Sequence, residues 1–147
     1  MNRSPEGTVL TDIILEVFKL NGLLVLEGDK LTKELGLTSA RWKVLGAIAG
    51  SGKPMTVPDI ARTMGQTRQA VQRLVNEMKQ AGLLHPQINP NHKRAKLLVL
   101  TEQGKECFEL MERKQIPWVN PIADRFTTPE LKQVFTILHK LTDSLEP

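Results

Sequence analysis

The stretch VPDIARTMGQTRQAVQRLV, residues 57–75, decides the fold of this chain. Thr56, just before it, and Asp59 form the pattern of a capping box, with Asp in place of the usual Glu, which opens a short helix. That helix stops at Gly65, and a second helix follows over residues 67–81. Two helices joined by a short turn that contains glycine are typical of a helix–turn–helix.

The second helix presents a polar face that suits the reading of DNA bases. An arginine can bind guanine O6 and N7 through two hydrogen bonds, and a glutamine or asparagine can bind adenine in the same way. No acidic residue occurs from residue 65 to residue 76, where an ordinary surface helix would carry several. The candidate contacts are Gln66, Thr67, Arg68, Gln69, Gln72, Arg73 and Asn76, with Thr56 as a phosphate contact.

Residues 88–101, INPNHKRAKLLVLT, predict a β-hairpin with a basic tip. Asparagine and proline are turn residues, and the apolar run at residues 97–100 is typical of a strand. A hairpin directly after a helix–turn–helix is a wing, whose cations can enter the minor groove or bind its phosphates. The predicted wing contacts are Asn91, His92, Lys93, Arg94 and Lys96.

The charge of the chain is concentrated in this segment. Residues 65–100 contain six basic side chains and one acidic side chain, whereas the whole chain of 147 residues has a net charge of +4. The remainder therefore carries a net charge of −1. A localised basic patch is the usual electrostatic footprint of a nucleic-acid site, although a solvated basic face would show the same charge.

Apolar residues at helical spacing predict further helices on both sides of this segment. The predicted helices span residues 8–26, residues 38 or 39 to about 50, the residues from 101 onward, and residues 128 to about 145. Pro117 and Pro121 are expected to kink or interrupt the helix that begins at residue 101. The predicted fold is mainly α with a small β-hairpin. Its terminal helices carry more apolar surface than one small core needs, so we expect them to pack together and against a second copy, with a monomeric bundle as the alternative.

At the segments DIARTMGQTRQAVQRLVNEMKQAGLL and NPNHKRAKLLVLTEQG the chain resembles the winged helix–turn–helix of the MarR (multiple-antibiotic-resistance regulator) family. The resemblance implies a DNA-binding lobe at residues 38–104 and helical dimerisation regions at 8–30 and 105–146. It also implies a homodimer on a pseudo-palindromic operator in double-stranded DNA, which represses or less often activates transcription until a small ligand or an oxidant relieves it.

The chain departs from the family pattern at two places. Family wings usually have an acidic residue two positions before the second basic residue, where it orients the wing arginine, and this chain has His92 there. Either another group is therefore expected to orient Arg94, or the wing is expected to hold DNA more loosely. Pro117 and Pro121 are the second departure, because the corresponding dimerisation helix is often long and regular.

The sequence predicts neither a catalytic site nor a metal site or cofactor. Three histidines and Cys107 lie far apart and show no metal-ligand spacing, and the run GSGKP at residues 50–54 lacks the spacing of a phosphate-binding loop. Arg41 and Trp42 are candidates to line a pocket for an aromatic anion, with a core tryptophan as the alternative. The single cysteine and the lack of a long apolar run or signal peptide favour a soluble cytoplasmic protein that enters no membrane.

The sequence therefore predicts a dimeric DNA-binding transcriptional regulator, a repressor released by a small-molecule effector. The competing hypothesis is a winged helix that binds another protein and has only non-specific DNA affinity. An enzyme is the third possibility, and no arrangement of polar residues supports it.

Overall fold

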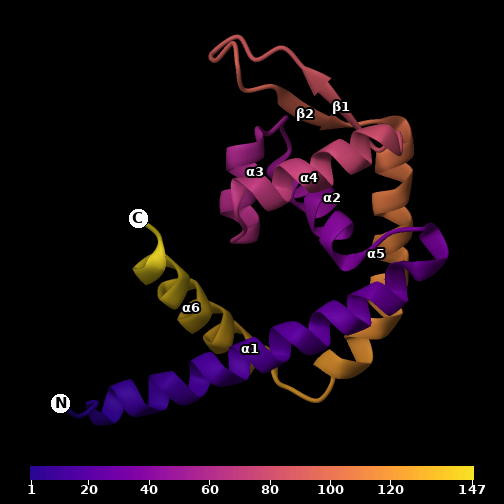
Figure 1. Ribbon diagram of the computed structural model, residues 1–147. Helices are drawn as coiled ribbons and strands as arrows, with labels where there is room; N and C mark the ends of the chain where they lie inside the picture. The colour runs from indigo at the N-terminus through magenta and orange to yellow at the C-terminus, as the bar shows by residue number, and fades with distance from the viewer. The chain divides into compact units, whose positions relative to one another are not determined.

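A computed structural model describes all residues of the chain, 1–147. The elements in order are α1 (Pro5–Thr32), the short 3-10 helix η1 (Lys33–Leu35), α2 (Ser39–Ser51), α3 (Val57–Met64), α4 (Arg68–Gln80), β1 (Leu84–Gln87), β2 (Leu97–Leu100), α5 (Glu102–Ala123) and α6 (Thr128–Leu145) (Figure 1). The chain divides into two compact units, residues 1–111 and 112–147, and the boundary falls within α5. The predicted fold class, mainly α with one hairpin, is confirmed.

The core of the first unit lies where α2, α3 and α4 contact one another. Ile60 of α3 and Val71 of α4 are completely buried, and Ala61 leaves room for α4 to approach α3 closely because its side chain is a single methyl group. The turn between these helices uses Gly65 at φ 65°, a left-handed conformation that glycine adopts without steric cost. The predicted helix–turn–helix is confirmed. The buried apolar residues of this unit are Leu37, Val44, Leu45, Ile48, Met55, Ile60, Ala61, Val71, Val75, Met78, Leu83, Leu84, Leu98 and Met111.

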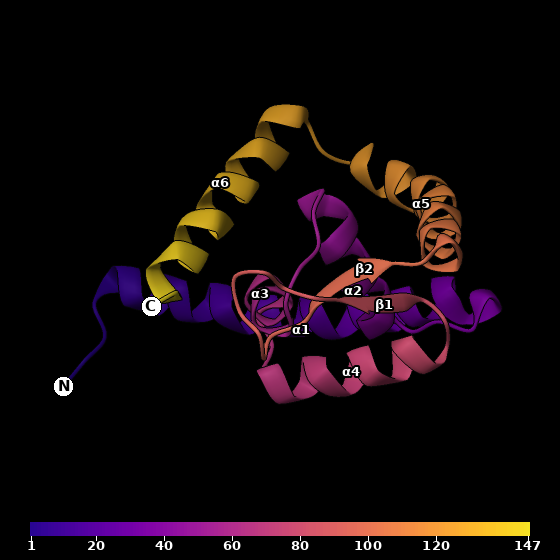
Figure 2. The same ribbon diagram turned by 90° about the horizontal axis from the view of Figure 1, so that it is seen from above.

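The hairpin packs directly against this core. Strands β1 and β2 are antiparallel, with Leu84 opposite Leu100 and Gln87 opposite Leu97. Leu98 is buried and also forms a β-bridge with Met55, which ties the hairpin to the segment before α3. Figure 2 shows α4 running alongside the hairpin, and α4 contacts β1. The wing therefore has a fixed position beside α4.

Helix α5 begins at a tight junction with the first unit. The Thr101 hydroxyl donates to the Gly82 carbonyl at 2.6 Å and accepts from the Gly104 backbone N–H at 3.0 Å. A Cβ atom on Gly104 would overlap the Leu83 carbonyl oxygen. The sequence Leu-Thr-x-x-Gly after the wing thus allows α5 to pass close to the chain that enters β1.

A second close approach holds α1 to α2, and it lies beyond the predicted end of the first helix. The helix was predicted for residues 8–26, but α1 extends from Pro5 to Thr32. Ser39 donates from its hydroxyl to the Val25 carbonyl and from its backbone N–H to Asp29, both at 2.8 Å. A Cβ atom on Gly28 would overlap Ser39. This glycine therefore serves helix packing and does not end the helix.

Pro117 and Pro121 were predicted to kink or interrupt a helix, and interruption does not occur, because α5 continues through both prolines to Ala123. Each proline removes one N–H donor and leaves the carbonyl four residues earlier without its helical partner. Both prolines are exposed in this chain. We attribute the continuity of the helix to hydration of those carbonyls, with the remaining turns still hydrogen-bonded.

The two long terminal helices keep large apolar side chains exposed. In α1 these are Val9, Leu10, Ile13, Ile14, Leu15, Val17, Phe18, Leu20, Leu23, Leu24 and Leu26, and in α6 they are Leu131, Val134, Phe135, Ile137, Leu138 and Leu145. Helix α6 begins with a capping box in which Thr127 and Glu130 bond to each other's backbone N–H groups. No helix in the structure combines the length and the apolar character needed to cross a bilayer.

Candidate nucleic-acid interface

A reciprocal pair of hydrogen bonds fixes the start of α3. The Thr56 hydroxyl oxygen accepts from the Asp59 backbone N–H at 3.3 Å, and the Asp59 carboxylate accepts from the Thr56 backbone N–H at 3.4 Å. Hydrogen bonding from the Thr56 side chain is the largest cause that lowers the pKa of Asp59, and burial opposes it. The predicted capping box is therefore present.

Helix α4 turns its polar face outward. Thr67 caps the helix by accepting from the Ala70 N–H at 3.1 Å, and Val71, Val75 and Met78 are buried on the opposite side. All seven predicted contacts of this segment are exposed, namely Gln66, Thr67, Arg68, Gln69, Gln72, Arg73 and Asn76. Gln72 donates to Asn76 at 2.9 Å along the helix, so these two amides form a connected pair on the exposed face.

The tip of the hairpin is held by its own hydrogen bonds. The Asn89 side chain accepts from the Asn91 N–H at 3.0 Å, and the Asn89 carbonyl accepts from the His92 N–H at 3.2 Å. The His92 Nδ1 atom then accepts from the Ala95 N–H at 3.2 Å. The imidazole of His92 therefore closes the loop that carries Arg94, whereas the origin of the Arg94 side-chain orientation stays a prediction.

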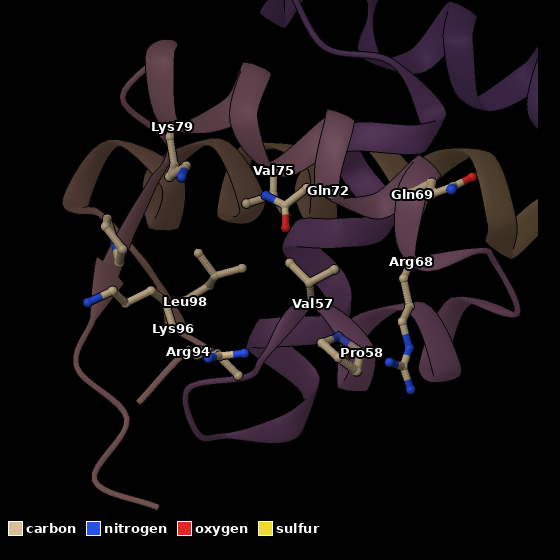
Figure 3. A pocket seen from close by; sticks show the side chains of 12 residues that line it. Val57, Pro58, Arg68, Gln69, Gln72, Val75, Lys79, Arg94, Lys96 and Leu98 are labelled. Atoms are coloured by element: carbon tan, nitrogen blue, oxygen red, sulfur yellow. The ribbon is translucent and has the colours of Figure 1, made fainter. Parts of the chain in front are cut away.

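A cleft of about 410 Å³ lies between α4, the start of α3 and the hairpin (Figure 3). In the close-up, Pro58 of α3 lies between Arg68 of α4 and Arg94 of the hairpin. The lining residues are Val57, Pro58, Arg68, Gln69, Gln72, Val75, Lys79, Pro86, Arg94, Ala95, Lys96 and Leu98. Four of them are cations and none is acidic, while the floor is apolar. Such a site attracts phosphate oxygens and offers them charged donors.

The structure brings some of the predicted contacts together and leaves others apart. Arg68, Gln69 and Gln72 of α4 share the cleft with Arg94 and Lys96 of the hairpin. A second, more open groove along α4 is lined by Gln69, Gln72, Arg73, Asn76, Glu77 and Gln80. Gln66, Thr67, Asn91, His92 and Lys93 line neither of these hollows. Of the predicted helix contacts, Arg68 lines only the cleft, Arg73 and Asn76 line only the second groove, and Gln69 and Gln72 line both.

Seven of the twelve residues that line the cleft were not among the predicted contacts, and Lys79 and Pro58 are the most informative of them. Lys79 lies seven residues after Gln72, two helical turns further along the same face, so helical spacing would have been enough to identify it. Pro58 occupies the first turn of α3, where proline is well tolerated because its missing N–H has no helical partner there. Its approach to the wing depends on tertiary packing, and no local pattern indicates it.

The two residues proposed to line an effector pocket have other contacts in the structure. Arg41 donates to the Glu77 carboxylate on α4 at 3.3 Å. Trp42 is half-buried and packs against the core. The effector pocket stays a prediction, and Arg41 gains a defined link to α4.

Cys107 has the surroundings of a structural thiol. It is half-buried and packs against the core. Burial raises the pKa of its thiol, and Glu106 adds to this effect, so the reactive thiolate is disfavoured. The chain has no cluster of three or more histidine, cysteine or acidic side chains with the geometry to hold a metal ion.

Comparison with known proteins relates this architecture to one family. A family model described as "MarR family" matches residues 35–95. The chain is 34% identical over 134 residues to uncharacterized protein Rv2011c of Mycobacterium tuberculosis, which covers 91% of this chain and 92% of that protein.

Two solved structures share the fold at 20% sequence identity. The MepR–DNA complex of S. aureus covers 89% of this chain and 96% of its own, with a TM-score of 0.74. CouR from Rhodococcus jostii RHA1 bound to p-coumaroyl-CoA covers 89% and 92%, with a TM-score of 0.80.

Proposed function

The chain belongs to the MarR family of transcription regulators, and we propose that it acts as a homodimeric repressor that binds a pseudo-palindromic DNA site and is released by a small-molecule effector. Members of this family are regulators and not enzymes. We further infer that the protein works in the cytoplasm, where a bacterial-type operator would be accessible to it.

The cleft between α4 and the wing is the observation that carries this proposal. Arg68 and Lys79 of α4 face Arg94 and Lys96 of the hairpin without any intervening carboxylate. In our account, α4 enters the major groove, where arginine and glutamine side chains read base edges. The wing cations bind the phosphates or enter the adjacent minor groove. The solved MepR–DNA complex, which shares this fold, supports the assignment.

The exposed apolar faces of α1 and α6 support a homodimer. Large apolar patches on the surface of one chain mark interaction surfaces, and side chains such as Phe18 and Phe135 remain 69% and 71% exposed here. A second copy that covered these faces would give the dimer two recognition helices. Two such helices match a site made of two inverted half-sites.

The proposed effector is a small organic molecule. CouR, of similar fold, was solved with p-coumaroyl-CoA bound, which supports ligand binding in this fold. Trp42 and Arg41 remain our candidate effector contacts, since an aromatic ring beside a guanidinium suits an aromatic anion. Screening of aromatic acids by thermal shift, with Trp42→Leu as the comparison, tests this assignment directly.

The experiment that tests the proposed function is the selection of bound duplexes from a randomised DNA pool. We expect the wild-type protein to enrich two inverted half-sites about one helical turn apart, roughly 10 base pairs from centre to centre. Phe135→Glu should yield monomers in sedimentation velocity and lose the paired half-sites. Gln133→Glu adds the same charge at a polar, exposed position of the same helix and should change neither result. If no sequence is enriched, the protein-binding interpretation replaces ours.

A further inference from the structure

Glu77 of α4 lies between two arginines that come from different elements. Its Oε2 atom is 3.3 Å from Nη2 of Arg41 on α2, and its Oε1 atom is 4.0 Å from Nε of Arg73, one turn earlier on α4. Glu77 is also the only acidic residue from residue 65 to residue 100. The segment that contains α4 and the wing therefore has a single carboxylate, which lies 4.0 Å from Arg73, one of the predicted base-reading arginines.

The two contacts differ in strength. The Arg41 side chain is 26% exposed and its contact is within hydrogen-bonding distance, whereas the Arg73 side chain is 83% exposed and its contact is beyond that distance. An arginine that precedes a glutamate by four residues is also the weaker orientation of such a helical pair. Glu77 therefore attracts the Arg73 guanidinium along the helix while leaving its N–H groups free for another acceptor.

We propose that Glu77 is a specificity-determining residue, which directs Arg73 toward base edges, and that Arg41 controls how strongly Glu77 holds Arg73. This inference rests on the proposed function, since it needs α4 in the major groove. A carboxylate near DNA repels the phosphates of every sequence. Hydrogen bonds between Arg73 and a base offset this unfavourable binding energy only on a sequence that has the matching base at that position. Glu77 therefore raises the discrimination between sequences and lowers the affinity for DNA in general.

Arg41 acts in this arrangement through Glu77 and needs no contact with DNA. While Arg41 is paired with Glu77, part of the carboxylate charge is neutralised and Arg73 is held only loosely. When Arg41 is removed, the full charge of Glu77 acts on Arg73 and on the phosphates. Repulsion of the phosphates weakens DNA binding, and a tighter hold on the Arg73 guanidinium leaves it less free to bind a base. Both effects depend on the presence of the Glu77 carboxylate.

The first test replaces the carboxylate by its neutral isostere. The probes are the duplex that the wild-type protein enriches from a randomised pool and a scrambled duplex of the same composition. For Glu77→Gln we expect tighter binding of the scrambled duplex and a ratio of affinities that falls at least about fivefold, the lower end of what one base-contacting arginine contributes. Glu102→Gln removes an exposed carboxylate that is also paired with a cation, Lys105, and should leave the ratio unchanged.

The second test separates the role of Arg41 from a loss of positive charge in general. Arg41→Ala should weaken binding of the enriched duplex by roughly two- to fivefold more than Lys43→Ala, the range of an exposed ion pair. In the Glu77→Gln background, Arg41→Ala should have no effect beyond that of Lys43→Ala. A purely structural role of Arg41 would persist in that background and would overturn the inference.

The outcomes separate this inference from the function on which it rests. A wild-type protein that prefers its enriched duplex, combined with an unchanged ratio for Glu77→Gln, overturns the role of Glu77 and leaves the regulator intact. A wild-type protein without sequence preference overturns the proposed function, and the inference falls with it. Circular dichroism of each variant confirms that the fold is retained, as expected for partly exposed side chains.

Discussion

The imidazole Nδ1 atom of His92 accepts a hydrogen bond from the backbone N–H of Ala95 at 3.2 Å, across the turn that carries Lys93 and Arg94. The wing loop is thus closed by the side chain that stands where related wings have a carboxylate. A neutral imidazole nitrogen and a carboxylate oxygen are both acceptors, so the two residue types can serve the same backbone donor.

This relationship predicts how the wing responds to substitution. His92→Ala removes the acceptor and should weaken binding of every DNA sequence by roughly two- to tenfold, the effect of one net hydrogen bond on the order of the loop. His92→Asn offers a carbonyl oxygen at nearly the place of Nδ1 and should retain most of the affinity. Titration of labelled duplexes measures both variants. Equal losses for alanine and asparagine would contradict the role of the Nδ1 acceptor.

Arg68 and Arg94 line the same cleft on either side of Pro58, and we expect them to differ in what they read. Arg68→Ala should reduce the preference for the selected site by about 1–3 kcal/mol, as the loss of a base contact does. Arg94→Ala should weaken all sequences similarly and lower the slope of log affinity against log salt by about one, as the loss of a phosphate contact does. Lys43→Ala, an exposed cation outside the cleft, is the control. Identical behaviour of the two arginine variants would refute the division of roles.

The capping box of α3 predicts a pH-dependent contribution to stability. Hydrogen bonding from Thr56 lowers the pKa of Asp59 below its ordinary value of 3.8 in the folded state. A carboxyl group whose pKa is lowered by folding stabilises the protein fully above its unfolded pKa, and this contribution is lost as the pH falls through the folded pKa. Thr56→Val should therefore lower the free energy of unfolding by about 1 kcal/mol at neutral pH, a typical value for a helix cap.

The pH dependence itself is the sharper part of this prediction. The difference in stability between the wild-type protein and Thr56→Val should shrink as the pH falls below the ordinary pKa of Asp59. Urea unfolding curves at neutral and acidic pH measure it. A difference that stays constant over that range would mean that Asp59 does not take part in the cap.

The close contact of Gly104 with the Leu83 carbonyl predicts a strong effect of a single methyl group. Gly104→Ala should lower the free energy of unfolding by about 1–3 kcal/mol, because the added Cβ must displace backbone. Gly50 lies in α2 with no atom within 4 Å of an added Cβ. Gly50→Ala should be neutral or stabilise by up to about 1 kcal/mol through helix propensity. Thermal unfolding of both variants checks the contrast.

The elements that local patterns could predict are those bounded by residues with strong conformational preferences. The helix at residues 57–64 was predicted with both ends as they occur, because Thr56 caps it and Gly65 terminates it. The end of α1 was missed because residues 27–32 are mostly polar and include Gly28, which reads as a breaker. Only the contact of Gly28 with Ser39 shows that this glycine belongs inside the helix.

The parts of the candidate site that lie within one local element could also be predicted from the sequence. The exposed face of α4 and the basic wing follow from helical spacing and turn residues. The pair of Arg41 and Glu77 joins residues 36 positions apart, and no periodicity in the sequence relates them. The hydrogen bond from the Ala95 N–H to His92 could not be predicted either, because it depends on where the loop places its backbone donors.

The measurement that tests the central claim most directly is fluorescence anisotropy with DNA from upstream of the protein's own reading frame, beside a scrambled duplex, at two salt concentrations. Our account predicts tight binding that favours the native fragment by about a thousandfold or more, the lower range of specific recognition. Equally weak binding of both duplexes, with the same steep salt dependence, would contradict it at this fragment. If the selection from a randomised pool also enriched no sequence, the basic cleft would be a non-specific surface and a protein partner would become the better explanation.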